Sequence, residues 1–167
     1  MLDTAHKPDY QRVKSVVRGL LAEFDVTIPP VNPVEIARSK GVGVKFVDFA
    51  GDADRISGFY DCDENAIYVN KHEFPLRQTF TVAHELGHAL MHKDWAASED
   101  YKILFRDSDY DGNDSYEKEA NAFAAHLLVP RFMLGEYWEG NTAESLSRLF
   151  AVSVPMIKNR LAFEYGV

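Results

Sequence analysis

The sequence predicts a compact, single-domain α+β protein of 167 residues, in which helices pack around a small antiparallel or mixed sheet. Apolar residues recur at helical spacing in several long segments, whereas short segments rich in Val, Ile, Phe and Tyr have the character of strands. Gly and Pro separate these segments, and the chain is long enough to bury a hydrophobic core. We therefore expect one domain over residues 1–167, with a core of about 30–130 and a helical C-terminal extension of about 131–167.

The first half of the chain contains the expected sheet. An amphipathic helix is predicted over 9–24, and a short helix over 33–40, with Asn32 as its N-cap and Gly41 after its end. An alternating strand follows over 42–49, and two short strands over 56–60 and 66–70 flank a polar turn, which indicates a hairpin. The segment 66–70 is either an edge strand that pairs with an extended substrate or an ordinary core strand.

The second half is predicted to be helical. Pro75 opens a helix that extends to residue 92, and its apolar residues lie on nearly all faces, so we expect it to be buried. Residues 94–114 form an acidic loop, and Ser115 caps a helix over 116–128. Shorter helices are expected over 132–138, 143–150 and 155–165.

Charge and composition exclude some functions. The chain has 18 basic and 26 acidic residues, a net charge of −8, which disfavours direct nucleic-acid binding and suits a basic partner. Cys62 is the only cysteine, so no internal disulfide forms, and neither a signal-peptide pattern nor a run of ~20 apolar residues is present. We expect a cytoplasmic protein without a membrane segment; the sequence gives no indication of oligomeric state.

The segment HELGH carries the strongest chemical signal. His84 and His88 are four residues apart and differ by about 40° around a helix, so both imidazoles project from one face. That spacing lets both bind one Zn²⁺, while Glu85 lies close enough to act as general base toward a metal-bound water. Because a buried His and Glu need partners or a metal, a metal site is favoured over an incidental polar stripe.

A third ligand must come from elsewhere in the chain. His92 lies about 12 Å along the helix from His84, too far to share one ion with it. Glu117 is the best placed acid, although an acid in the first turn of a helix is also favoured by the helix dipole. Asn121 lies one turn further on the same face, where it can accept the N–H of a ligand histidine and fix its orientation.

HELGH followed by EKEANAFAAHLLVP resembles the ImmA/IrrE family of metallo-endopeptidases, and the likeness extends from about residue 32 to 130. The resemblance implies a gluzincin-like domain with a zincin-like active-site helix. It implies His84, His88 and Glu117 as zinc ligands and Glu85 as the general base. It also implies limited cleavage of a helix-turn-helix repressor of the XRE type, often encoded nearby.

Two questions stay open at the level of sequence. The side chain that would stabilise the transition state is not identifiable; the candidates are Tyr60, Tyr68, His72, Tyr101, Tyr110 and Tyr116, with His126 disfavoured by its direction on the helix. The alternative to an active protease is a non-catalytic, metal-stabilised regulatory or toxin–antitoxin binding module.

Overall fold

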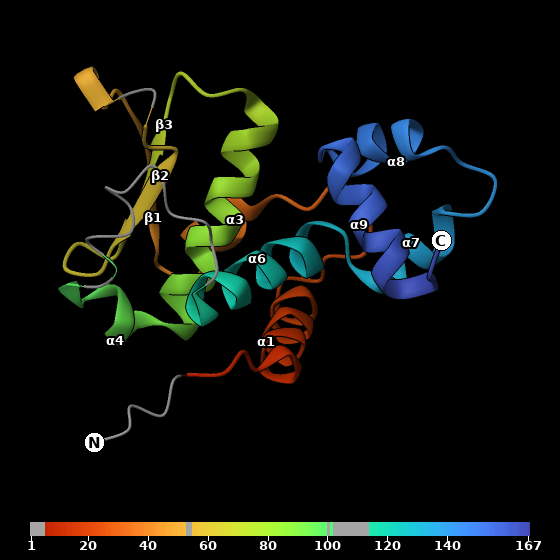
Figure 1. Ribbon diagram of the computed structural model, residues 1–167, viewed down its shortest axis with the longest axis horizontal. Coiled ribbons are helices and arrows are strands. Elements are labelled where there is room, and N and C mark those ends of the chain that lie inside the picture. The colour runs from red at the N-terminus through yellow and green to blue at the C-terminus, as the bar shows by residue number, and fades with distance from the viewer. Residues whose placement is uncertain (1–5, 53–54, 100, 102–113) are drawn as a thin grey trace.

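A three-stranded mixed sheet lies against the long helix that carries the HELGH segment (Figure 1). The computed structural model describes residues 6–52, 55–99, 101 and 114–167. The strands are β1 (Gly43–Val47), β2 (Gly58–Asp61) and β3 (Ala66–Asn70), in the order β1-β3-β2. β2 and β3 form the predicted antiparallel hairpin, whereas β1 runs parallel to β3.

The position of β3 decides between the two alternatives for residues 66–70. β3 is the central strand, with β1 on one side and β2 on the other, so an edge role for this strand is wrong. Four of its five residues are buried, which explains why its sequence is almost continuously apolar. The hairpin strand at the edge is β2.

Two helices cross at the centre of the molecule. α3 (Pro75–Met91) packs on the sheet, and α6 (Ser115–Leu128) crosses α3 on the side away from the strands (Figure 1). Gly87 lies at this crossing, where a Cβ would meet the Phe123 ring at 3.0 Å. A side chain at position 87 would push the two helices apart.

The remaining helices enclose this centre. α1 (Tyr10–Glu23) packs against α6, and α2 (Pro33–Ser39) packs against α3. The predicted limits of these helices agree with the structure to within a residue or two. A 3₁₀ turn, η1 (Ala50–Asp52), follows β1.

The segment expected to be a loop is partly helical. α4 (Lys93–Ala96) follows α3 directly, and residues 100 and 102–113 lie outside the described residues. The predicted cap of α6 was wrong by one residue. Asp114, not Ser115, accepts hydrogen bonds from the N–H groups of Tyr116 and Glu117. A carboxylate at this position also complements the helix dipole.

The C-terminal helices α7 (Arg131–Tyr137), α8 (Ala143–Phe150) and α9 (Val154–Tyr165) share the hydrophobic core with the rest of the molecule. Arg160 is buried, donates from Nε to the Val129 carbonyl at 3.0 Å and pairs with Glu164 at 2.9 Å. None of the helices described here combines the length and apolar character needed to cross a bilayer.

Candidate metal centre

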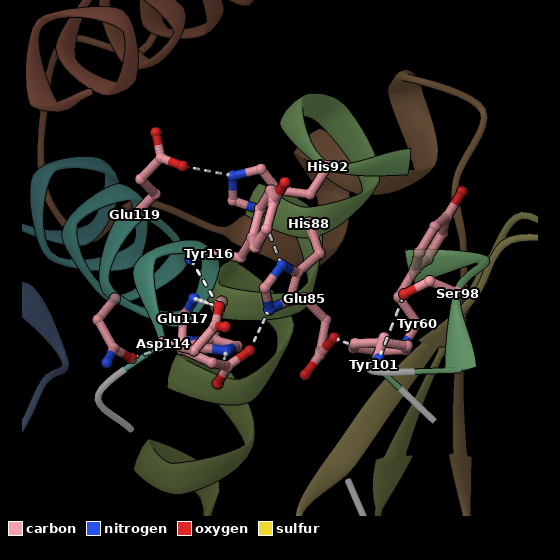
Figure 2. A network of polar contacts seen from close by, with 12 residues as sticks. Tyr60, Glu85, His88, His92, Ser98, Tyr101, Asp114, Tyr116, Glu117 and Glu119 are labelled. Atoms are coloured by element: carbon pink, nitrogen blue, oxygen red, sulfur yellow. Dashed lines mark hydrogen bonds and ion pairs between the residues drawn. The ribbon is translucent and has the colours of Figure 1, made fainter. Parts of the chain in front are cut away.

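Three side chains from two helices converge in one place. His84 and His88 project from α3, and Glu117 projects from the first turn of α6. Nε2 of His88 lies 2.7 Å from one carboxylate oxygen of Glu117, and Nε2 of His84 lies 3.2 Å from the other. Figure 2 shows Glu117 directed at His88 across the gap between the helices.

The donor atoms fit a metal ion chemically. One nitrogen from each histidine and one oxygen of Glu117 lie within 4.8 Å of one another. Ligands at tetrahedral Zn²⁺ are separated by about 3.3 Å, given bond lengths near 2.0–2.1 Å. Two imidazoles and one carboxylate are also a set that catalytic zinc sites use, with a fourth position left for water.

Asn121 contacts the outer nitrogen of His84. Its Oδ1 lies 2.9 Å from His84 Nδ1, which places the ring proton on Nδ1 when the amide oxygen accepts. The lone pair of Nε2 then faces Glu117, where a metal would take it. The structure therefore brings Asn121 into hydrogen-bond distance of His84, and its supporting role toward a metal ligand stays a prediction.

Glu85 lies beside the two histidines on α3 and points toward the sheet. Its Oε2 accepts a hydrogen bond of 2.8 Å from the Tyr101 hydroxyl, and that hydroxyl oxygen accepts one of 2.5 Å from the Tyr60 backbone N–H (Figure 2). Glu85 and Tyr101 are both buried. A carboxylate held in this way has a fixed direction.

Burial and mutual contacts shift the titration of these groups. Burial raises the pKa of Glu85 to about 7, and burial lowers the pKa of His88 to about 4. For Glu117, burial acts upward, but hydrogen bonds from His84 and His88 outweigh it and hold its pKa well below the usual range. Burial likewise acts to lower the pKa of His84, and contacts with Glu117 and Glu85 reverse the shift.

Of the side chains considered for transition-state stabilisation, Tyr101 lies closest to the proposed base. Tyr68 instead bonds Glu64 on the sheet surface, and His72 pairs with Asp48. The other candidates have the following surroundings: the Tyr60 hydroxyl bonds Asn65, the Tyr116 ring stacks on Trp95, His126 packs against Phe163, and Tyr110 lies outside the described residues.

Sequence reasoning missed the surroundings of His88. The Trp95 ring lies 5.0 Å from the His88 ring, and His92 contacts His88 on its outer nitrogen. Trp95 falls in the segment expected to be a loop, and His92 was considered only as a ligand. The i to i+4 spacing of His88 and His92 was the available signal, because it places the two rings on one helical face.

Comparison with known proteins identifies relatives. Residues 37–162 match the peptidase family described as the IrrE N-terminal-like domain. The chain is 30% identical over 133 residues to the "uncharacterized immunity region protein 2" of Bacillus phage phi105, covering 77% of this chain and 75% of the phage protein. It is 32% identical over 150 residues to the "radiation response metalloprotease IrrE" of Deinococcus radiodurans, covering 81% of this chain but 40% of IrrE.

A solved structure shares the fold. A Mycobacterium tuberculosis transcriptional regulator superposes with a TM-score of 0.65 at 17% identity, covering 91% of this chain and 46% of the regulator. The chain therefore spans less than half of that regulator and of the Deinococcus radiodurans protein. The match over 37–162 also reaches into the C-terminal helices, beyond the span that the motifs suggested. The likeness drawn from HELGH and the α6 segment is confirmed, and the chain belongs to the IrrE N-terminal-like domain family of peptidases.

Proposed function

We propose that the protein is a cytoplasmic, zinc-dependent endopeptidase that makes limited cuts in a protein substrate. The observation that carries this proposal is the convergence of His84, His88 and Glu117 beside a buried Glu85. The three residues act as the metal ligands and Glu85 as the general base. Zinc bound there would lower the pKa of a bound water toward ~7 and polarise the scissile carbonyl.

Glu85 moves the proton. Its carboxylate takes the proton from the attacking water and later passes it to the leaving amine. A pKa near 7 suits this exchange, because the group can both accept and release a proton at neutral pH. Tyr101 holds the carboxylate through its hydroxyl, which donates its single proton to Glu85 Oε2.

An apolar groove beside His84 provides a place for the substrate. The groove has a volume of about 740 Å³ and lies between α3, α6 and the start of α9. Phe80 and Asn121 line it, and both contact His84, so the groove adjoins the proposed ligands. Apolar walls with a few polar groups suit the side chains of a peptide segment.

The edge of the sheet offers a second contact. Among the residues that the structure describes, β2 is an edge strand of the sheet, with β3 on its inner side. An extended substrate segment can pair with such an edge through its main chain. The substrate would then lie between β2 and the groove, with its scissile bond close to Glu85.

The substrate that we propose is a basic helix-turn-helix repressor of the XRE type, encoded near the protease gene. A net charge of −8 attracts a basic DNA-binding protein. One relative is an immunity region protein of a phage, and another is named a radiation response metalloprotease, which supports a regulatory role.

The test uses the full chain and the repressor encoded beside it. We expect the wild type to bind one zinc ion and cut the repressor at one or a few positions, and a chelator to stop the reaction. E85Q should keep the zinc and lose at least about 10²-fold in rate, because it removes the base but no ligand. Cleavage by E85Q, or cleavage that survives zinc removal, would overturn the proposal. Tight binding without cleavage would instead favour the regulatory binding module.

A further inference from the structure

A buried hydrogen-bonded chain continues from His88 away from the proposed ligands. His88 Nδ1 lies 2.9 Å from His92 Nδ1, and His92 Nε2 lies 3.1 Å from Glu119 Oε1 (Figure 2). His88, His92 and Glu119 are at most 3% exposed. Trp95 and Tyr116 pack against the His92 ring and separate the chain of contacts from water.

The N-terminal segment closes the far end of this chain. Glu119 Oε2 accepts the backbone N–H of Asp9 at 3.1 Å, and Glu119 Oε1 lies 2.5 Å from His6 Nε2. Asp9 is also the N-cap of α1. Through these contacts, Glu119 links α6 to His92, which follows α3, and to Asp9 at the start of α1.

Chemistry fixes where each ring proton lies. If His88 gives the lone pair of Nε2 to a metal, its proton must be on Nδ1, which faces His92. His92 must then accept at Nδ1 and carry its own proton on Nε2, which faces Glu119. An ionised carboxylate only accepts hydrogen bonds, so every contact is satisfied in one direction.

We propose that His92 and Glu119 are positioning residues that hold His88 in the metal-binding tautomer and orientation. The inference rests on the proposed function, because it takes His88 as a ligand. Asn121 holds the ring of His84 through one hydrogen bond. The ring of His88 is held by His92, which is held in turn by Glu119. The N-terminal segment, His6 to Asp9, holds the carboxylate at the end of the series.

The alternative to a positioning role is a second cation site, formed by His6, His92 and Glu119. Donor atoms of His6, His92 and Glu119 lie within 4.8 Å of one another. An ion on His92 Nε2 would move the His92 proton to Nδ1, where it would face the Nδ1 proton of His88 across 2.9 Å. Two N–H groups cannot form that hydrogen bond, so the two ions exclude each other. We therefore expect one zinc per chain, held by His84, His88 and Glu117.

Metal affinity tests the role of His92 without an activity assay. H92F removes the acceptor for His88 and should lower zinc affinity about 10–100-fold, measured by competition with a chelator. H92Q should restore most of it, because an amide can accept from His88 and donate to Glu119. H126Q is the matched control on α6: it replaces a histidine that contacts none of the ligands and should leave the affinity unchanged.

Nitrogen NMR of the zinc-loaded wild type tests the tautomers directly and does not depend on a variant that folds. The expected result is a proton on Nδ1 of His88 and on Nε2 of His92. The reverse assignment for His92, an unchanged affinity in folded H92F, or a second zinc that H6A removes would each overturn the inference. A wild-type chain that binds no zinc would overturn the metal centre itself, whereas normal zinc binding without proteolysis would overturn only the proposed activity.

Discussion

His126 is a histidine of α6 whose surroundings favour the neutral ring. Burial lowers its pKa to about 4, and the nearby cations Arg160 and Lys14 act in the same direction, against the opposing carboxylate of Glu164. The Phe163 ring packs edge-on against it at 5.5 Å. This histidine therefore bears on how the stability of the fold depends on pH, not on the proposed chemistry.

We expect His126 to make the fold sensitive to mild acid. Its folded pKa lies below the unfolded value of about 6.5, so the unfolded chain binds the extra proton first. Its contribution to the free energy of unfolding is complete above pH ~6.5 and is lost as the pH falls toward ~4. Between pH 7 and pH 5, the free energy of unfolding of H126Q should therefore fall by about 1–2 kcal/mol less than that of the wild type.

Denaturant unfolding of both proteins at several pH values measures this difference. Identical pH dependence of wild type and H126Q would show that His126 is protonated equally in both states.

At the level of residues, spacing alone indicated His84, Glu85 and His88, because two imidazoles one helical turn apart must face the same way. Glu117 and Asn121 followed from the need for a third ligand and from their own spacing. Tyr101 was one of several tyrosines, and nothing in its local sequence marks its contact with Glu85. The contacts of Glu119 with His6 and Asp9 join residues more than a hundred positions apart, which no local pattern records.

At the level of elements, the crossing of α3 and α6 sets the geometry of the centre. The crossing is close because Gly87 has no side chain where Phe123 packs. His88 is the next residue on α3, and Glu117 must reach it from α6. The distance between the helices therefore controls the distance between the proposed ligands.

Two glycine-to-alanine substitutions should have opposite effects. G87A places a Cβ 3.0 Å from the Phe123 ring, so we expect a loss of about 1–3 kcal/mol in the free energy of unfolding, together with weaker zinc binding. G19A lies on the exposed side of α1 with nothing within 4 Å, so it should stabilise the protein by about 0.5–1 kcal/mol.

Chemical unfolding and zinc competition on the two variants check this pair. Equal effects of the two substitutions would show that the close approach at Gly87 does not matter.

The helices were predictable because Pro75, Asn32 and the apolar periodicity are local signals. The order of the strands was not, since the parallel pairing of β1 with β3 depends on how the chain crosses the sheet. The cap of α6 was missed by one residue because Asp and Ser are both favoured caps and stand side by side in the sequence.

At the level of the whole molecule, the proposed ligands join two parts of the chain that are far apart in sequence. His84 and His88 belong to the helix on the sheet, and Glu117 belongs to the helix that packs on α1. The periodicity of apolar residues and the short strand-like segments predicted the fold class, and the combined motifs predicted the family. The groove is formed in part by α9, whose position against α3 and α6 is a property of the assembled core.

Zinc should therefore stabilise the entire fold. At a free zinc concentration about 100 times the dissociation constant, the gain is about 2.7 kcal/mol. For a protein of this size, that gain should raise the melting temperature by about 5–10 °C. Calorimetry of the metal-free and zinc-loaded protein measures the shift, and H88A should show little of it. An equal shift in H88A would mean that the zinc binds elsewhere.

The attachment of residues 6–9 to Glu119 has a thermodynamic consequence. If the contacts of residues 6–9 with Glu119 increase the affinity for a metal ion, metal binding must stabilise those contacts by the same free energy. The reason is that linkage between two binding events is reciprocal. Contacts of residues 6–9 with Glu119 and binding of the proposed metal ion would then each strengthen the other. Fusions or truncations at that end would change how tightly this peptidase keeps its metal.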